Sequence, residues 1–296
     1  MKKKTSTHAL RIALFPAISL WVATALAQTP EKPQPPPDDW TQTNFSQSNS
    51  ACVQPGCKPF DLSAHAAMTP QGEQCSNELN AAIYRQDVLH AFEAKAHFDN
   101  CAFDDATSYV DELVAETLAQ LRAGPTPRPG ANELQSPHAK AAALAMGQAL
   151  HAIQDFYAHS NYVELIQAQM PNIRSQADLP LVEIWKPSGK ARLAALKTAG
   201  LVSGRVWWGV PQRCSAAVPT HANLAKDSPG TPAGGASSSF KRPFDNAVVV
   251  NNEVATNLAV RASREFLAWM ATQAPQLEAV CGSTVRFIVQ RDRRSE

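Results

Sequence analysis

Apolar side chains recur at three- and four-residue steps between Ser136 and Leu165, and this spacing predicts a long helix with one buried face. The repeat consists of Ala143, Met146, Leu150, Ile153 and Tyr157. Ser136 followed by Pro137 is typical of an N-cap with proline at the first helical position. The rest of the chain is interpreted around this central helix.

Similar repeats predict further helices over residues 77–97, 104–121, 191–201 and 246–273. In the first of these, Val88 and Phe92 are expected to face inward together with Leu79, Ile83 and Ala96. The pattern typical of strands is weak throughout, and proline- and glycine-rich segments such as GPTPRPG (residues 124–130) separate the helices. We therefore predict a mostly α fold, a multi-helix bundle around an interior polar site.

Three side chains that can bind metal lie at four-residue steps on the central helix: His151, Asp155 and His159. Each step of four residues turns by about 40°, so the three side chains project from nearly the same side. His151 and His159 are separated by about 12 Å along the helix axis, too far to share one ion, whereas Asp155 could bridge two ions. The alternative interpretation is a set of buried hydrogen bonds or an ordinary salt link within the helix.

The sequence LHAIQDFYAHSNYVEL, at residues 150–165, resembles the signature of the heterokaryon-incompatibility (HET-C) family. Three other stretches add to the resemblance in the expected order: DLSAHAAMT around His65, HFDN at residues 97–100, and THANLAKDSPG at residues 220–230. More distantly, the chain is similar to the zinc-dependent phospholipase C and P1 nuclease superfamily, helical enzymes with clustered zinc ions that cleave phosphodiesters. The resemblance implies the fold of that superfamily, with helices around an interior metal site.

The resemblance also implies a set of metal ligands: His65, His97, Asp99, His151, Asp155, His159 and His221. Asp99 and Asp155 are the candidate catalytic residues, Asp155 as a bridge between ions and Asp99 as a ligand or as the carboxylate that orients attack. Glu164 and Asp227 are second-tier candidates that would complete the site or orient a histidine. Histidine and carboxylate ligands suit zinc, two or three ions of it, with manganese or iron as the alternatives.

Such a cluster predicts a phosphodiester hydrolase, because metal ions polarise phosphoryl oxygens and lower the pKa of bound water. The expected enzyme is a secreted phospholipase C-like hydrolase in peripheral contact with a membrane, and Trp207–Trp208 is either a substrate-facing loop or a packed pair. The alternatives are a single-strand nuclease and a non-catalytic HET-C-type recognition or incompatibility module with a structural or degenerate metal site. The head group and the oligomeric state stay open.

The composition of successive segments predicts the domain organisation of the chain. The net charge of +1 over 296 residues gives no basis for bulk affinity for nucleic acid, and the apolar fraction of 44% is ample for a core. Residues 1–27 have the basic start, apolar stretch and small-residue end of a signal peptide, which predicts export to the periplasm or the medium after cleavage near Ala27. Residues 28–50 are a proline-rich and polar linker, and residues 51–296 a single helical domain with a mobile loop near 226–244.

All six cysteines follow the predicted cleavage site: Cys52, Cys57, Cys75, Cys101, Cys214 and Cys281. An even number of cysteines in an exported chain favours disulfides, although the sequence leaves 15 pairings open. Cys52 and Cys57 flank a Pro-Gly turn and could pair with each other. A thiolate zinc site is the rival interpretation, but the chain has no pair of cysteines separated by two residues.

Overall fold

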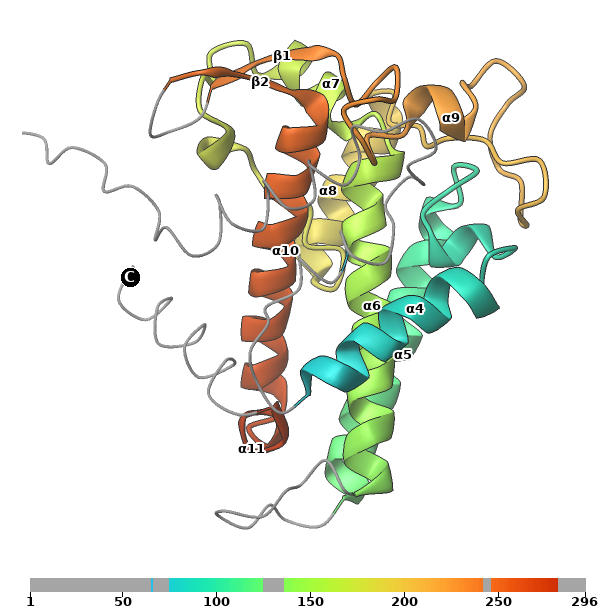
Figure 1. The fold of residues 1–296 in the computed structure, drawn as a ribbon, viewed down its shortest axis with the longest axis vertical. Helices are drawn as coiled ribbons and strands as arrows, with labels where there is room; N and C mark the ends of the chain where they lie inside the picture. Colours follow the sequence, from blue (N-terminus) through green and yellow to red (C-terminus); the bar gives the residue numbers. More distant parts are fainter. Residues whose placement is uncertain (1–64, 66–74, 125–135, 242–245, 282–296) are drawn as a thin grey trace, which may run out of the picture. The chain divides into compact units, whose positions relative to one another are not determined.

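Helix α6 (Pro137–His159) is the central element of the fold, and α4 (Ser76–Leu89), α5 (Phe103–Ala123) and α10 (Asn251–Gln273) all pack against it (Figure 1). The computed structural model describes residues 65, 75–124, 136–241 and 246–281, all of which belong to the unit Pro35–Glu296. The mostly α fold predicted from the sequence is confirmed. The predicted signal peptide, the linker at residues 28–50 and the C-terminal tail lie outside the described residues.

The other elements are short. They are η1 (Ala94–Ala96), α7 (Tyr162–Gln169), η3 (Gln176–Asp178), α8 (Pro187–Thr198), α9 (His221–Leu224), β1 (Ser237–Lys241), β2 (Val248–Val250) and α11 (Gln276–Cys281). Within the described residues, β1 and β2 form the one sheet, an antiparallel pair in which Ser237 lies opposite Val250. Of the segment for which a mobile loop is predicted, residues 228–236 fold into hydrogen-bonded turns and residues 237–241 into β1.

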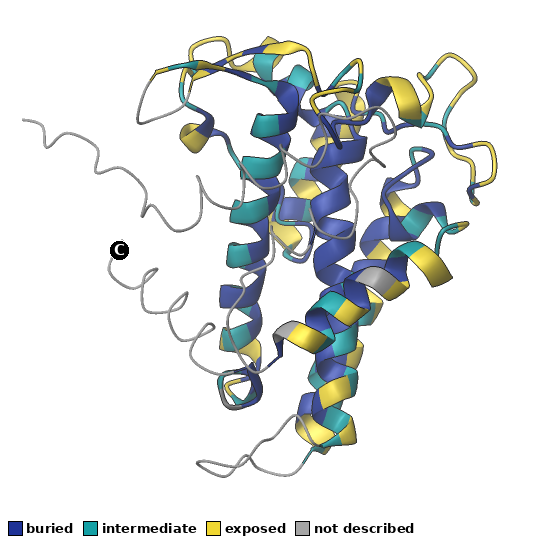
Figure 2. Cartoon of the chain, in the orientation of Figure 1, coloured by how far each residue is buried: buried dark blue, intermediate teal, exposed yellow. Residues whose placement is uncertain are grey.

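Helix α6 is buried more completely than a one-sided pattern predicts. Every residue from Ala149 to His159 is buried, and Figure 2 shows this half of the helix in dark blue. Small side chains allow this, because they let neighbouring helices approach closely. At Gly147 a Cβ atom would lie 2.6 Å from Ala82 Cβ and 2.9 Å from the carbonyl oxygen of Leu79, so α4 crosses α6 at a position where only glycine fits.

Several predicted helix ends are wrong because backbone partners far along the chain intervene. The predicted 77–97 helix stops at Leu89, and Val88 and Phe92, expected inside, are 54% and 66% exposed. The backbone beyond the helix pairs with Val210 instead, through Val210 N to Phe92 O (2.9 Å) and Ala94 N to Val210 O (2.8 Å).

The central helix likewise ends before Leu165. Ser136 is its N-cap, although its hydroxyl makes no capping hydrogen bond, and the helix stops at His159. Ser160 is extended and forms a bridge with Ser203, after which α7 starts a new helix. The last long helix begins at Asn251 and not at 246, because residues 248–250 form β2.

Two disulfides connect distant parts of the described chain: Cys75–Cys281 and Cys101–Cys214. Cys52 and Cys57 lie outside the described residues. The two disulfides are compatible with an extracellular location. A bilayer-spanning helix would have to be long and continuously apolar, and none of the helices in the described part of the chain meets that requirement.

Candidate metal centre

Histidine and aspartate side chains from five parts of the chain meet beside the C-terminal half of α6. This His/Asp cluster consists of His65, Asp87, His97, Asp99, His151, Asp155, His159, His221 and Asp227. Three groups within it have ligand atoms that all lie within 4.8 Å of one another: His65/His151/Asp155, Asp87/His97/His151 and Asp99/His159/His221. The structure thus brings together all seven ligands predicted from the sequence.

Asp155 lies at the middle of the cluster and is only 1% exposed. One carboxylate oxygen, Oδ2, lies 3.0 Å from His97 Nδ1 and 3.0 Å from His151 Nε2. The other oxygen, Oδ1, lies 3.2 Å from His65 Nε2 and 3.7 Å from His159 Nε2. The two oxygens therefore face separate histidine pairs, which is the arrangement expected of a carboxylate between two ions.

Asp87 is a member of the cluster that the sequence analysis missed. Its Oδ1 lies 3.4 Å from His151 Nε2 and 4.0 Å from His97 Nδ1. A signal was present: Asp87 follows Leu79 and Ile83 at four-residue steps, so it places a charge on the face of α4 whose other members are buried.

The group Asp99/His159/His221 forms the other end of the cluster and includes Asp227. His221 Nδ1 lies 2.9 Å from Asp99 Oδ1, and His159 Nδ1 lies 3.6 Å from the same oxygen. Asp227 approaches both histidines from the opposite side, at 3.3 Å from His159 Nε2 and 3.4 Å from His221 Nε2. Asp227, a second-tier candidate, therefore lies within the cluster.

Glu164, the other second-tier candidate, lies apart from the cluster. Its Oε2 pairs with Lys226 Nζ at 3.0 Å, and its Oε1 accepts a hydrogen bond from Asn251. Lys226 is fully buried and also donates to the carbonyl of Ser160 (2.7 Å). Glu164 thus neutralises the buried ammonium of the residue that precedes Asp227, which explains its position better than a ligand role.

The charges in the cluster are strongly coupled. Burial would lower the pKa of His159, but the carboxylates of Asp155, Asp227 and Asp99 raise it well above its ordinary value. Burial and the charge of His159 act to lower the pKa of His221, yet the neighbouring carboxylates of Asp227 and Asp99 raise it to about 9. At neutral pH these two imidazoles therefore hold protons.

At the opposite end of the cluster, the pKa of His151 is shifted in the other direction. Burial lowers the pKa of His151 to about 3, so this imidazole is neutral and has a free electron pair for a ligand bond. Burial would raise the pKa of Asp155, but the neighbouring His151, His159 and His65 hold it well below its usual range. Asp155 is therefore ionised, as a metal-bridging carboxylate must be.

Several buried polar atoms of the cluster lack a well-formed hydrogen bond among the described residues. They are His97 Nε2, His151 Nδ1 and, despite imidazole neighbours at 3.2–3.7 Å, Asp155 Oδ1 and both carboxylate oxygens of Asp227. A buried polar atom left in this state costs about 1–3 kcal/mol, so their concentration at one place calls for a further partner. The buried histidine and aspartate groups can hold a metal ion, and a cation would satisfy the carboxylate oxygens among these atoms.

The turn that delivers His97 and Asp99 has an unusual backbone. Phe98, Asn100 and Cys101 have φ angles of 53°, 56° and 56°, in the left-handed region that residues other than glycine rarely adopt. Such conformations cost of order 1–3 kcal/mol each and persist only where the surroundings enforce them. They place Asp99 beside His159 and His221 while Phe98 packs into the core against Phe156.

Part of the chain matches one known protein family. Residues 62–190 match the model of the family described as the VWA7 N-terminal domain. The match ends before His221 and Asp227 but contains every other member of the His/Asp cluster. No curated protein and no solved structure matches this chain.

This match shows that the resemblance to the HET-C family, and to the phospholipase C and P1 nuclease superfamily, is wrong. The reason lies in what the motif reports. Histidine and aspartate at four-residue steps are what a helix needs to present ligands on one side, and any helical metal site can meet that requirement. The spacing of His151, Asp155 and His159 on α6 thus indicates the chemistry of the site and does not identify the family.

Proposed function

We propose that this protein is a metal-dependent phosphoric diester hydrolase whose His/Asp cluster holds zinc ions. The observation that carries the proposal is Asp155, which is buried and has each carboxylate oxygen against a different pair of histidines. A single enclosed structural ion would need only one tetrahedral set of ligands. Two of the three groups share His151, and Asp155 lies 3.7 Å from His159 of the third group, which suits a site with more than one ion.

The donor set supports zinc. Imidazole and carboxylate donors without thiolate are common to zinc sites, and His65, His151 and Asp155 would hold one ion, with Asp99, His159 and His221 holding another. When bound, divalent ions polarise phosphoryl oxygens and lower the pKa of water.

The side chains of the cluster would divide the remaining tasks. Asp155 and His151 are almost completely buried, so they exclude water from the floor of the site. Asp99 lies between His159 and His221 and is placed to orient the attacking water. His221 and Asp87, whose side chains are 22% and 33% exposed, mark the side that a substrate can reach. In the reaction, the oxygen of water bonds to phosphorus, the bond from phosphorus to the alcohol oxygen breaks, and the leaving oxygen takes up a proton in place of the one that the water gives up.

Exposed aromatic side chains favour a phospholipid as the substrate. Trp207 and Trp208 are 90% and 44% exposed, so the pair is not packed against the domain. Exposed Phe92 and Val210 lie beside each other through the backbone bonds described above. Aromatic rings are favoured where lipid meets water, which supports peripheral contact with a membrane. Together with the disulfides, this favours an exported protein.

The proposal is tested with purified protein, zinc and phospholipid vesicles. We expect release of the phosphorylated head group and diacylglycerol, loss of activity on chelation, recovery with zinc, and no recovery in His151→Ala. Single-stranded nucleic acid is assayed in parallel, and cleavage of nucleic acid alone would overturn the lipid substrate but keep the hydrolase. A zinc-loaded protein inert on both substrates would overturn the proposal in favour of a non-catalytic recognition module.

A further inference from the structure

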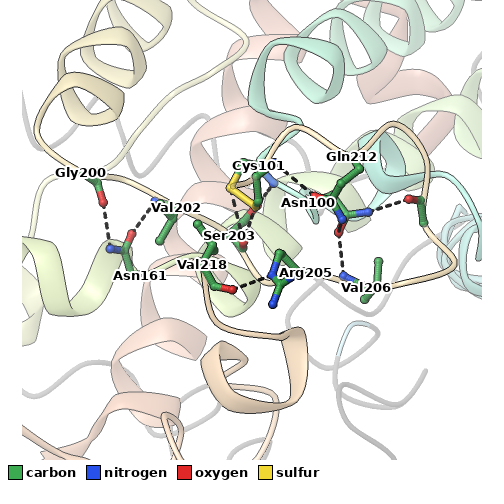
Figure 3. Close-up of a disulfide and its surroundings, with 12 residues drawn as sticks. Asn100, Cys101, Asn161, Gly200, Val202, Ser203, Arg205, Val206, Gln212 and Val218 are labelled. Carbon is green, nitrogen blue, oxygen red and sulfur yellow. Dashed lines mark hydrogen bonds between the residues drawn. A yellow bond between two sulfur atoms is a disulfide. The ribbon is translucent and has the colours of Figure 1, made fainter. Parts of the chain in front are cut away.

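Asn100 lies outside the His/Asp cluster, yet all its polar atoms bond to residues 204–214. Its side chain is fully buried. Its Nδ2 donates to Gly209 O (2.7 Å), and its Oδ1 accepts from Val206 N (2.7 Å) and Gln212 Nε2 (3.0 Å), as the dashed lines in Figure 3 show. Three contacts thus fix one side chain against residues more than a hundred positions away.

The backbone of Asn100 binds the same segment. Its N–H donates to Gly204 O (2.8 Å), and its carbonyl accepts from Arg213 N (2.9 Å) and Cys214 N (3.0 Å). The disulfide Cys101–Cys214 joins the same two segments covalently (Figure 3). The strained turn that carries Asp99 is therefore attached to the segment Gly204–Cys214 on both sides of Asn100.

This segment also contacts the two histidines that share a group with Asp99. Gly204 N donates to His159 O (3.0 Å), and His221 N donates to Arg205 O (2.9 Å). A Cβ atom at Gly204 would lie 2.5 Å from His221 Cα, so the backbones approach as closely as glycine permits. His159 and His221 thus bond to Gly204–Arg205. Asn100, which follows Asp99, bonds to Gly204 through its backbone and to Val206, Gly209 and Gln212 through its side chain.

We propose that Asn100 is a positioning residue for the group Asp99/His159/His221, and that it sets the place of Asp99 opposite His221. The inference rests on the proposed metal site but not on hydrolysis. Mutating a hydrogen-bond partner that helps to orient a metal ligand typically weakens metal binding by about 10–100-fold. A residue that only supports the fold would change stability without changing the affinity of one group of ligands.

The test is Asn100→Gly, because glycine adopts a φ of 56° without strain while it removes the three side-chain hydrogen bonds. The disulfide keeps the two segments joined in this variant, so it is expected to fold. Zinc content and zinc affinity are measured by competition with a chromophoric chelator. We expect one class of bound zinc to weaken by about 10–100-fold while the remaining zinc is unchanged.

Asn161 provides a matched control. Its Nδ2 donates to Gly200 O (3.1 Å) and its Oδ1 accepts from Val202 N (2.8 Å), so it makes the same kind of contact to the start of the same loop without touching the Asp99 turn (Figure 3). Asn161→Ala is expected to lower the melting temperature and to leave every zinc affinity unchanged.

If folded Asn100→Gly binds every zinc ion with wild-type affinity, the inference about Asn100 is overturned, whereas the proposed metal site is not. A wild-type protein that binds no zinc would overturn both. If Asn100→Gly does not fold, Gly209→Ala serves instead, because its Cβ would lie 2.8 Å from Asn100 Nδ2 and disturb the same contact from the other side. Unchanged zinc affinity in folded Gly209→Ala would contradict the inference equally.

Discussion

At the scale of single residues, the account depends on the charge of Asp155. Its carboxylate faces four histidines, and replacing it with asparagine keeps its size and one acceptor oxygen but removes the negative charge that we propose to bridge two cations. We expect Asp155→Asn to lose more than one equivalent of bound zinc, measured by elemental analysis after desalting. Asp104→Asn is the control, because Asp104 is an exposed surface partner of Lys197 and should leave the zinc content unchanged. Wild-type zinc content in Asp155→Asn would show that Asp155 is structural.

The protons on His159 and His221 predict how zinc binding depends on pH. A pKa of His221 raised to about 9 means that the ion-free protein gains stability from this proton below about pH 6.5 and loses it as the pH rises through about 9. Zinc must displace the protons, so competition from protons weakens as the pH rises. The increase in melting temperature caused by zinc is therefore expected to be larger at about pH 8 than at about pH 6. An increase that is constant or falls over this interval would contradict the ligand role of these histidines.

At the scale of elements, the position of the cluster depends on how closely α4 packs on α6. Alanine at Gly147 would favour the helix by about 1 kcal/mol, but its Cβ would meet Ala82 and the backbone of Leu79. We expect Gly147→Ala to lower the free energy of unfolding by about 1–2 kcal/mol in urea denaturation. Gly124→Ala is the control, because its Cβ would lie 3.4 Å from His138 Cβ and should change stability by no more than about 0.5 kcal/mol. A more stable Gly147→Ala would show that α4 can move away at no cost.

The sequence predicts elements well where their periodicity is local and poorly where distant backbone intervenes. The apolar spacing predicts α5, α6 and α10 because each buries its own repeat. The same spacing extends α4 to residue 97 and joins α6 to α7, since nothing in those residues indicates the pairing with Val210 or with Ser203. The periodicity of α4 places the charge of Asp87 on its buried face, but the partners of Asp87 depend on the crossing of α4 over α6, which no motif indicates.

At the scale of the whole molecule, Cys75–Cys281 connects the start of α4 with the end of α11 across 206 residues. Closing such a long loop restricts the unfolded chain, so replacing both cysteines with serine should lower the free energy of unfolding by about 2–4 kcal/mol. Urea denaturation of the variant and of the wild type under non-reducing conditions measures this difference. Equal stability would show that the packing of α10 and α11 alone holds these ends together.

The sequence indicates some features of the site and not others. The ligand types, and the four-residue spacing of His151, Asp155 and His159, indicate a candidate metal site. The fold brings His65, His97, Asp99 and His221 beside these three residues. The predicted resemblance to the HET-C family is wrong because the spacing of the ligands follows from helix geometry, which different families share. The contacts of Asn100 could not be predicted either, because they join residues over a hundred positions apart.

The central claim is that the His/Asp cluster holds more than one metal ion around Asp155. Anomalous scattering at the zinc absorption edge, from crystals of the zinc-loaded protein, tests it most directly because it locates each ion. The account predicts at least two zinc positions, one in the group His65/His151/Asp155 and one in the group Asp99/His159/His221. Crystals in which zinc is absent from the cluster, or in which one ion is fully enclosed by ligands, would contradict it.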